Sequence, residues 1–127
     1  MNIALWIVQI LLACLFLVVG AAKAFSATEA MAQAMSLSTA LVRFIGVCEI
    51  LGALGLILPA ASRIMPKLTV WAAIGLGTVM VLATAFHISR AEYPNAAGPI
   101  ALLAGTAFVA YGRSAKRPIV ARRAQTA

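Results

Sequence analysis

The residue with the most unusual setting is Glu49, a carboxylate inside the apolar run 44–58 of a chain that has only three acidic residues. An ionised group at bilayer depth costs at least about 2.5–3.5 kcal/mol, so it normally faces the protein interior and a polar partner. Three further polar side chains, Lys23, His87 and Arg90, lie near the ends of other apolar runs. Brought together, these groups would bind a small polar head group or relay a proton. The alternative is a structural ion pair that fixes helix register.

The elements that position these side chains are predicted to be transmembrane helices, because the chain is too apolar for a soluble domain. Its 127 residues are 64% hydrophobic and 10% charged, against about 45–50% and 25% in soluble domains. Four apolar runs cover residues 3–22, 44–61, 68–88 and 96–111. The first and third approach or exceed the roughly 20 residues that a helix needs to cross a bilayer, and the short fourth run can extend at both ends. All are too long and too uniformly apolar for β-barrel strands. We therefore predict an all-α fold, a transmembrane four-helix bundle.

A short helix is predicted between the first two spans. Ser26 and Glu29 match a capping box, and residues 28–35 are typical of an amphipathic helix with Met31 and Met35 on one side. We expect this helix to lie at the outer membrane interface. The first run itself is expected to be an uncleaved span, since no Lys or Arg precedes it and it exceeds the about 7–15 residues of a signal-peptide core.

The distribution of charge predicts the orientation of a transmembrane domain, residues 1–113, and a basic cytoplasmic tail, residues 114–127. With four spans, both termini share one side with the loop between the second and third spans. That side carries seven cations: Arg63, Lys67, Arg113, Lys116, Arg117, Arg122 and Arg123. The other side carries Lys23, Arg43 and Arg90, offset by Glu29 and Glu92. The positive-inside rule then predicts a multi-pass protein of the inner or plasma membrane with both termini in the cytoplasm. We expect the +7 net charge to meet anionic membrane lipid and not nucleic acid.

Helical periodicity places polar residues on faces that turn toward the bundle. In the first span, four residues fall on one face, each within about 40° of the first of them at 100° per residue. They are Gln9, Phe16, Gly20 and Lys23. A stripe of mostly small or polar residues follows the third span through Ala73, Gly77, Met80, Thr84 and His87. Small residues let helices approach closely, as predicted for Gly46 and Gly52 beside Glu49 and for a seam of Gly98, Gly105 and Gly112.

The rise along each helix predicts that the polar side chains meet in the outer third of the bundle. Glu49 lies about 9 Å inside the boundary set by Arg43, and His87 lies about 4–5 Å inside that set by Arg90. We expect Lys23, on its long stem, to reach Glu49. We also expect His87 to hydrogen-bond with Glu49 and Arg90 to close the site. Secondary candidates are Gln9, Arg43, Thr84 and Glu92.

Other site chemistries are disfavoured by the residues present. One histidine and no aspartate offer too few ligands for a metal, and nothing around His87 indicates haem. Cys14 lies about 180° around the first helix from Lys23, so we predict no disulfide with Cys48. Trp6 is expected to anchor the cytoplasmic interface, as is Trp71.

Three segments resemble the DoxX-like family. They are a lysine after Gly-Ala-Ala in the first span, the pattern Arg43-Phe-Ile-Gly-x-x-Glu49-x-x-Gly-Ala-x-Gly-Leu in the second, and Phe86-His87-x-x-Arg90-x-Glu92 at the end of the third. The resemblance covers nearly the whole chain except the tail and implies a four-helix membrane bundle. The namesake is a subunit of an archaeal thiosulfate:quinone oxidoreductase, and other relatives are linked to redox maturation of partner proteins or to receptor assembly. By this resemblance, Lys23, Glu49, His87 and Arg90 match recurrent polar positions, while no catalytic cysteine pair or cofactor motif is matched.

Two functions follow as hypotheses. The first is a redox-linked accessory subunit, at most part of a membrane oxidoreductase complex, whose polar pocket accepts a quinone-like head group. The second is a non-catalytic assembly or chaperone module whose glycine seams hold a membrane-protein partner or a second copy. A small transporter is less favoured, because the chain shows neither broken helices nor repeat halves.

Overall fold

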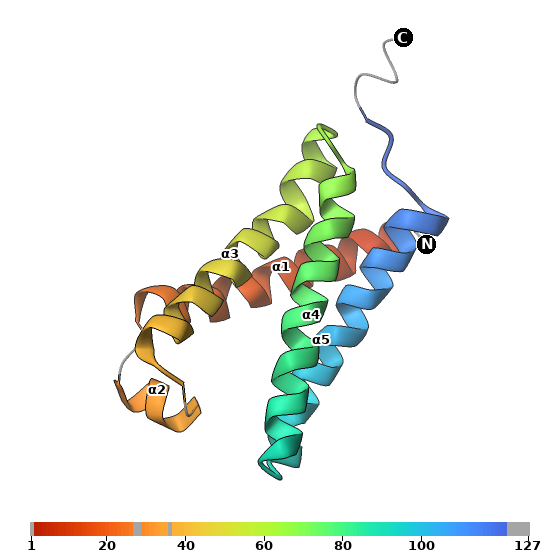
Figure 1. Cartoon of the computed structure of the whole chain (residues 1–127). Helices are drawn as coiled ribbons and strands as arrows, with labels where there is room; N and C mark the ends of the chain where they lie inside the picture. Colours follow the sequence, from red (N-terminus) through yellow and green to blue (C-terminus); the bar gives the residue numbers. More distant parts are fainter. Residues whose placement is uncertain (1, 27–28, 36, 122–127) are drawn as a thin grey trace.

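The protein is a bundle of four long helices in the computed structural model, which describes residues 2–26, 29–35 and 37–121 (Figure 1). Each of the four is long and apolar enough to cross a membrane, so the predicted all-α architecture with four spans is confirmed. The long helices are α1 (Asn2–Phe25), α3 (Thr39–Ser62), α4 (Lys67–Ser89) and α5 (Tyr93–Tyr111). The short helix α2 (Glu29–Met35) follows α1, and a π-helical turn, η1 (Gly112–Lys116), continues α5.

The ends of the helices follow from local sequence. The Ser38 hydroxyl caps α3 by accepting a hydrogen bond from the Leu41 amide at 3.1 Å. Arg63 ends that helix in the left-handed region, at φ 57°. Pro66 then precedes the first turn of α4, where a missing N–H costs nothing. A tight turn at Ala91, with φ 56°, connects α4 to α5.

Glycines set the close contact between α1 and α3. A Cβ on Gly46 would lie 2.6 Å from the Gly20 carbonyl oxygen, and one on Gly20 would lie 2.8 Å from the Gly46 carbonyl oxygen. Three residues beyond Glu49, a Cβ on Gly52 would lie 2.6 Å from the Leu76 side chain of α4. The predicted role of the two glycines beside Glu49 is confirmed, and each admits a different neighbouring helix.

Side chains from all four spans form the apolar core. Its buried members are Leu12 and Phe16 of α1, Ala53 and Leu56 of α3, Ala73, Leu76 and Met80 of α4, and Val109 of α5. The inward faces predicted for the first and third spans are therefore confirmed over most of their length. The end of the α4 stripe nearest the α4–α5 turn differs, because Thr84 and His87 are only half-buried.

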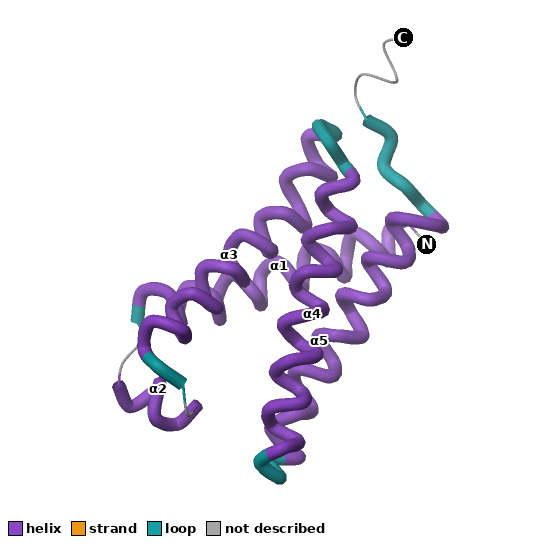
Figure 2. The backbone as a smooth tube through the Cα atoms, in the orientation of Figure 1, coloured by secondary structure: helices purple, strands orange, loops and turns teal. Residues whose placement is uncertain are grey.

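The half-burial reflects the shape of the bundle, which is closed at one end and open at the other. Figures 1 and 2 show the pair α1 and α3 diverging from the pair α4 and α5 toward α2 and the α4–α5 turn. Gly112, the first residue of η1, meets Leu5 of α1, and Gly105 of α5 meets Leu12 of α1, whereas nothing lies within 4 Å of a Cβ on Gly98. The predicted glycine seam is thus formed by two of its three members, because α1 has already moved away at the level of the third.

The helix α2 exists, but it begins differently from the prediction. The Ser26 amide donates to the Ala22 carbonyl at 3.0 Å and so ends α1, which leaves that amide unavailable to Glu29. The return hydrogen bond of the predicted capping box, from the Ser26 amide to the Glu29 side chain, is therefore replaced, and residues 27 and 28 of the box lie outside the described residues. Thr28 and the side chains of Met31 and Met35 lie outside the described residues. The interfacial position of α2 stays a prediction.

Candidate functional site

The core of the candidate site is an ion pair between α1 and α3. Lys23 Nζ donates to Glu49 Oε1 at 2.9 Å, which confirms the predicted contact. The Glu49 side chain is 1% exposed and that of Lys23 is 19% exposed. The second carboxylate oxygen, Glu49 Oε2, is buried and has no hydrogen-bond partner among the described residues. One acceptor inside the bundle is therefore left free.

The glycine contact brings this pair together. Lys23 follows Gly20 by one turn in α1, and Glu49 follows Gly46 by one turn in α3. Because the two glycine carbonyls lie against the facing helix, the Glu49 Cβ lies 3.0 Å from a Cβ on Gly20. The helices are close enough that the lysine crosses to the facing helix instead of extending to the interface. The close packing of the two helices therefore brings both groups together.

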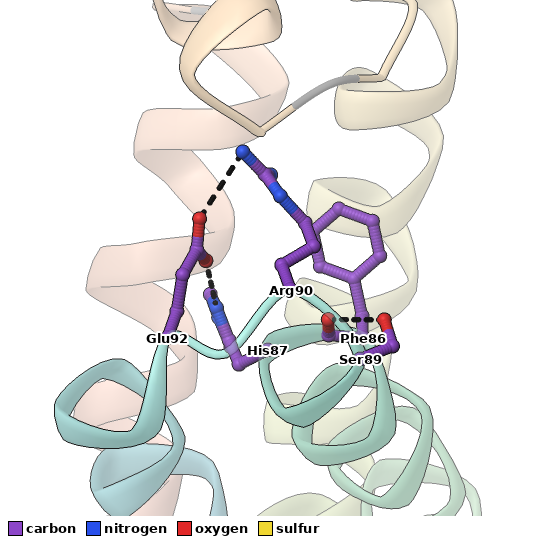
Figure 3. A network of polar contacts seen from close by, with 5 residues as sticks. All are labelled: Phe86, His87, Ser89, Arg90 and Glu92. Carbon is purple, nitrogen blue, oxygen red and sulfur yellow. Dashed lines mark hydrogen bonds and ion pairs between the residues drawn. The ribbon is translucent and has the colours of Figure 1, made fainter.

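A second polar cluster lies at the turn between α4 and α5, with Glu92 at its centre (Figure 3). One carboxylate oxygen, Oε2, pairs with His87 Nδ1 at 2.9 Å, and the other, Oε1, pairs with an Arg90 nitrogen at 3.1 Å. The Arg90 guanidinium lies 5.2 Å from the centroid of the Phe86 ring, within the range of a cation–π contact. Every member belongs to one short segment, so the cluster is a property of this turn.

The environment of Glu92 favours its charged form. The hydrogen bond from His87 lowers the pKa of the Glu92 carboxyl most. Slight desolvation raises it, and the charge of Arg90 lowers it further. Together these effects lower the pKa of the Glu92 carboxyl from its ordinary value of 4.5. Glu92 therefore stays ionised and holds the two basic side chains at the end of α4.

The structure corrects the expectation that His87 and Arg90 meet Glu49. Both pair with Glu92, which the sequence had marked only as a secondary candidate. The physical reason is the divergence of the helix pairs, which carries the end of α4 away from Glu49 while the turn brings Glu92 back onto His87 (Figure 1). The spacing His87-x-x-Arg90-x-Glu92 was the available signal, because it places a carboxylate at the helix end beside two bases.

The remaining candidates have separate surroundings. Gln9 is fully buried and donates to the Leu56 carbonyl at 2.7 Å. The Thr84 hydroxyl donates to Met80 of its own helix, and Arg43 is exposed. As predicted, Cys14 points away from the bundle face; it is exposed. The described residues contain no group of three or more His, Cys, Asp or Glu side chains that could hold a metal ion.

A buried charged residue was missed by the sequence reasoning, which counted Arg113 only as a topology signal. Arg113 is 3% exposed, and its Nε donates to Gln9 Oε1 at 2.5 Å. Its guanidinium lies 5.1 Å from the Trp6 ring centroid, so the expected interface anchor also packs against a cation. The signal was Gln9 itself, since a buried amide near one end of α1 needs a polar partner from another helix.

Comparison with known proteins gives one family. A model of the DoxX-like family matches residues 7–109, a segment that contains the ion pair and the turn cluster and ends before Arg113. No curated protein matches the chain, and no solved structure matches it.

Proposed function

The chain belongs to the DoxX-like family, and from this membership we propose that it is a redox-linked accessory subunit that accepts a quinone-like head group in the outer half of its bundle. The observation that carries the proposal is the free oxygen of Glu49. A buried carboxylate with one lone-pair site unused is an acceptor for a hydroxyl group, and a quinol supplies two hydroxyl groups. The neighbouring Lys23 ammonium is a donor for the carbonyl oxygen of the oxidised form.

The route to this pair runs through Lys23. Glu49 is almost completely covered, whereas about a fifth of the Lys23 side chain is exposed. A head group entering from the bilayer therefore meets Lys23 first, and the long lysine stem can turn outward to admit it. The divergence of the helix pairs leaves this end of α1 and α3 less covered by α4 and α5 (Figure 2), which favours lateral entry from the lipid, where a quinone tail resides.

The turn cluster supplies a second polar surface on the other helix pair. His87, Arg90 and Glu92 are each about one-quarter to one-third exposed. We propose that this cluster holds the α4–α5 turn in shape at the outer membrane surface and faces the polar side of the entry route.

The test is titration of the detergent-solubilised protein with short-chain benzoquinones and naphthoquinones. We expect an increase in unfolding temperature for the wild type and none for Glu49→Gln. The matched control is Glu29→Gln, because Glu29 is exposed in α2 and loses the same charge. Equal stabilisation of Glu49→Gln and Glu29→Gln would refute the proposal, as would no stabilisation of the wild type.

Intrinsic fluorescence adds a positional control. Trp6 lies beside Arg113 and Trp71 lies near Pro66, so both tryptophans are at the opposite end of the bundle. Quinones quench tryptophan on contact. We expect the thermal shift to occur with little quenching, whereas strong quenching at the same concentrations would place the quinone at the wrong end.

A second proposed function is an assembly module, and Gly98 favours it. This residue continues the seven-residue glycine spacing of α5, but nothing lies within 4 Å of a Cβ built on it. A close helix from a membrane-protein partner or from a second copy would complete the seam. Cross-linking in membranes tests this: Gly98→Leu should remove a stoichiometric cross-linked species, and a wild-type chain that yields only monomer would contradict it.

A further inference from the structure

The end of the bundle opposite Glu49 contains a buried cation with incomplete bonding. Arg113 Nη1 donates to Asn2 Oδ1 at 2.6 Å and to the Arg117 carbonyl at 3.2 Å, and its Nε donates to Gln9. All three acceptors are neutral. The remaining nitrogen, Nη2, is buried and has no hydrogen-bond partner among the described residues. A buried donor without a partner in an otherwise bonded side chain is available for a hydrogen bond to a ligand.

No acidic side chain among the described residues compensates the charge of this guanidinium. The sequence has three acidic residues, and each lies elsewhere. Glu49 pairs with Lys23, Glu92 pairs with His87 and Arg90, and Glu29 begins α2. Burial of a charge is costly unless an opposite charge accompanies it. The surroundings of Arg113 therefore favour an anion that does not come from an acidic side chain of this chain.

Space and further cations are present beside it. Arg113 lines a cavity of about 430 Å³ together with Asn2, Trp6, Arg63 and Arg117. It also lines a second cavity of about 550 Å³, to which Lys67 contributes. Figure 1 shows why these groups gather: the N-terminus, the α3–α4 connection and the segment after η1 all lie at this end. Three arginines thus surround one cavity at the end of the membrane spans.

We propose that Arg113, Arg63 and Arg117 form a binding site for a phosphate group at the membrane surface. The guanidinium fork matches phosphate oxygens through paired hydrogen bonds, and the free Nη2 supplies the donor. Trp6 fixes the level of the site, because tryptophan concentrates at the headgroup region. Basic pockets at the ends of membrane helices take the phosphate of anionic lipids. The same chemistry would serve free phosphate, and the experiment separates the two sources.

The test uses the full chain in phosphatidylcholine nanodiscs that contain a minor fraction of phosphatidylglycerol, with retained lipid counted by native mass spectrometry. The test variant is Arg63→Gln/Arg117→Gln, which leaves Arg113 and its protein contacts in place. The control is Arg43→Gln/Lys116→Gln, which removes two charges that do not line the cavity of about 430 Å³. We expect each arginine of the site to contribute about fivefold to anionic-lipid affinity, so the test variant should lose about twenty-five-fold and the control variant, whose charges lie outside the site, should lose less.

A parallel titration with inorganic phosphate, followed by thermal unfolding in neutral detergent, identifies the source. Retention of phosphatidylglycerol without a response to phosphate supports a lipid site, and stabilisation by phosphate supports a site for the free anion. The proposal is overturned if the wild type neither retains the lipid nor responds to phosphate. It is also overturned if the control variant loses as much as the test variant.

Discussion

Removing Lys23 should destabilise the protein far more than removing Glu49, although both changes break the same ion pair. Lys23→Met leaves the carboxylate of Glu49 in place, and that side chain is 1% exposed. Glu49→Gln leaves the ammonium of Lys23, whose side chain is 19% exposed and long enough to turn toward the interface. The asymmetry follows from burial. The Glu49 carboxylate cannot reach water when Lys23 is removed, whereas the Lys23 ammonium can reach water when Glu49 is removed.

The expected magnitudes follow from these exposures. Loss of one partner from a buried ion pair costs about 3–5 kcal/mol when the remaining charge stays buried, which is the case for Lys23→Met. Glu49→Gln keeps a hydrogen bond, because the glutamine oxygen still accepts from Lys23, and loses only the negative charge of the acceptor. Its cost should therefore be about 1.5 kcal/mol, the lower end of the range for hydrogen bonds to charged groups. The double variant Lys23→Met/Glu49→Gln contains no buried charge at this position. It should therefore be more stable than Lys23→Met by about 2 kcal/mol.

The assay is unfolding of the purified protein in mixed micelles of increasing SDS content, followed by the helical signal in circular dichroism. Free energies of unfolding for the wild type, the two single variants and the double variant form a double-mutant cycle. Equal costs for the two single variants would refute the burial argument. A double variant that is less stable than Lys23→Met would refute it as well.

Three further predictions concern packing, pH and orientation. Gly46→Ala should lower the free energy of unfolding by about 1–3 kcal/mol, since its Cβ would overlap the α1 backbone. Gly98→Ala should raise the free energy of unfolding by up to about 1 kcal/mol, since nothing lies within 4 Å of its Cβ. A change of the same sign in both variants would contradict the packing. Because the pKa of Glu92 is lowered in the folded state, the stability it contributes is full above pH 4.5 and is lost as the pH falls through its folded pKa. Thermal unfolding between pH 6 and pH 3 should therefore be less pH-dependent in Glu92→Gln than in the wild type, and identical profiles would contradict this. We propose that both termini are cytoplasmic, so a C-terminal fusion to green fluorescent protein should fluoresce and one to alkaline phosphatase should be inactive; the reverse pattern would invert the orientation.

The elements and the main contact were accessible from the sequence because they depend on local rules. Runs of apolar residues fix the four spans, and the glycines three residues either side of Glu49 indicate where helices approach. The contact between Lys23 and Glu49 was predicted from the helix face on which Lys23 lies and from the depth of each residue, given by the rise per residue. Each of these inferences uses one helix or one pair of helices.

The failures concern relations among three or more helices. Depth along each helix predicted that His87 and Arg90 would lie near Glu49, but depth gives no lateral distance. The divergence of the helix pairs, which keeps both residues away from Glu49, depends on the packing of all four spans, whereas their pairing with Glu92 is local to the α4–α5 turn. The burial of Arg113 was missed for the same reason, since its partners Gln9 and Asn2 come from the other end of the sequence.

The most direct test of the central claim is the infrared difference spectrum produced when a short-chain quinone binds to the protein. If the head group occupies the free oxygen of Glu49, binding must change the carboxyl absorption of that side chain. We predict a difference band in the carboxyl region that is present in the wild type and in Glu29→Gln and absent in Glu49→Gln. A spectrum without a carboxyl band, or a band that persists in Glu49→Gln, would contradict it.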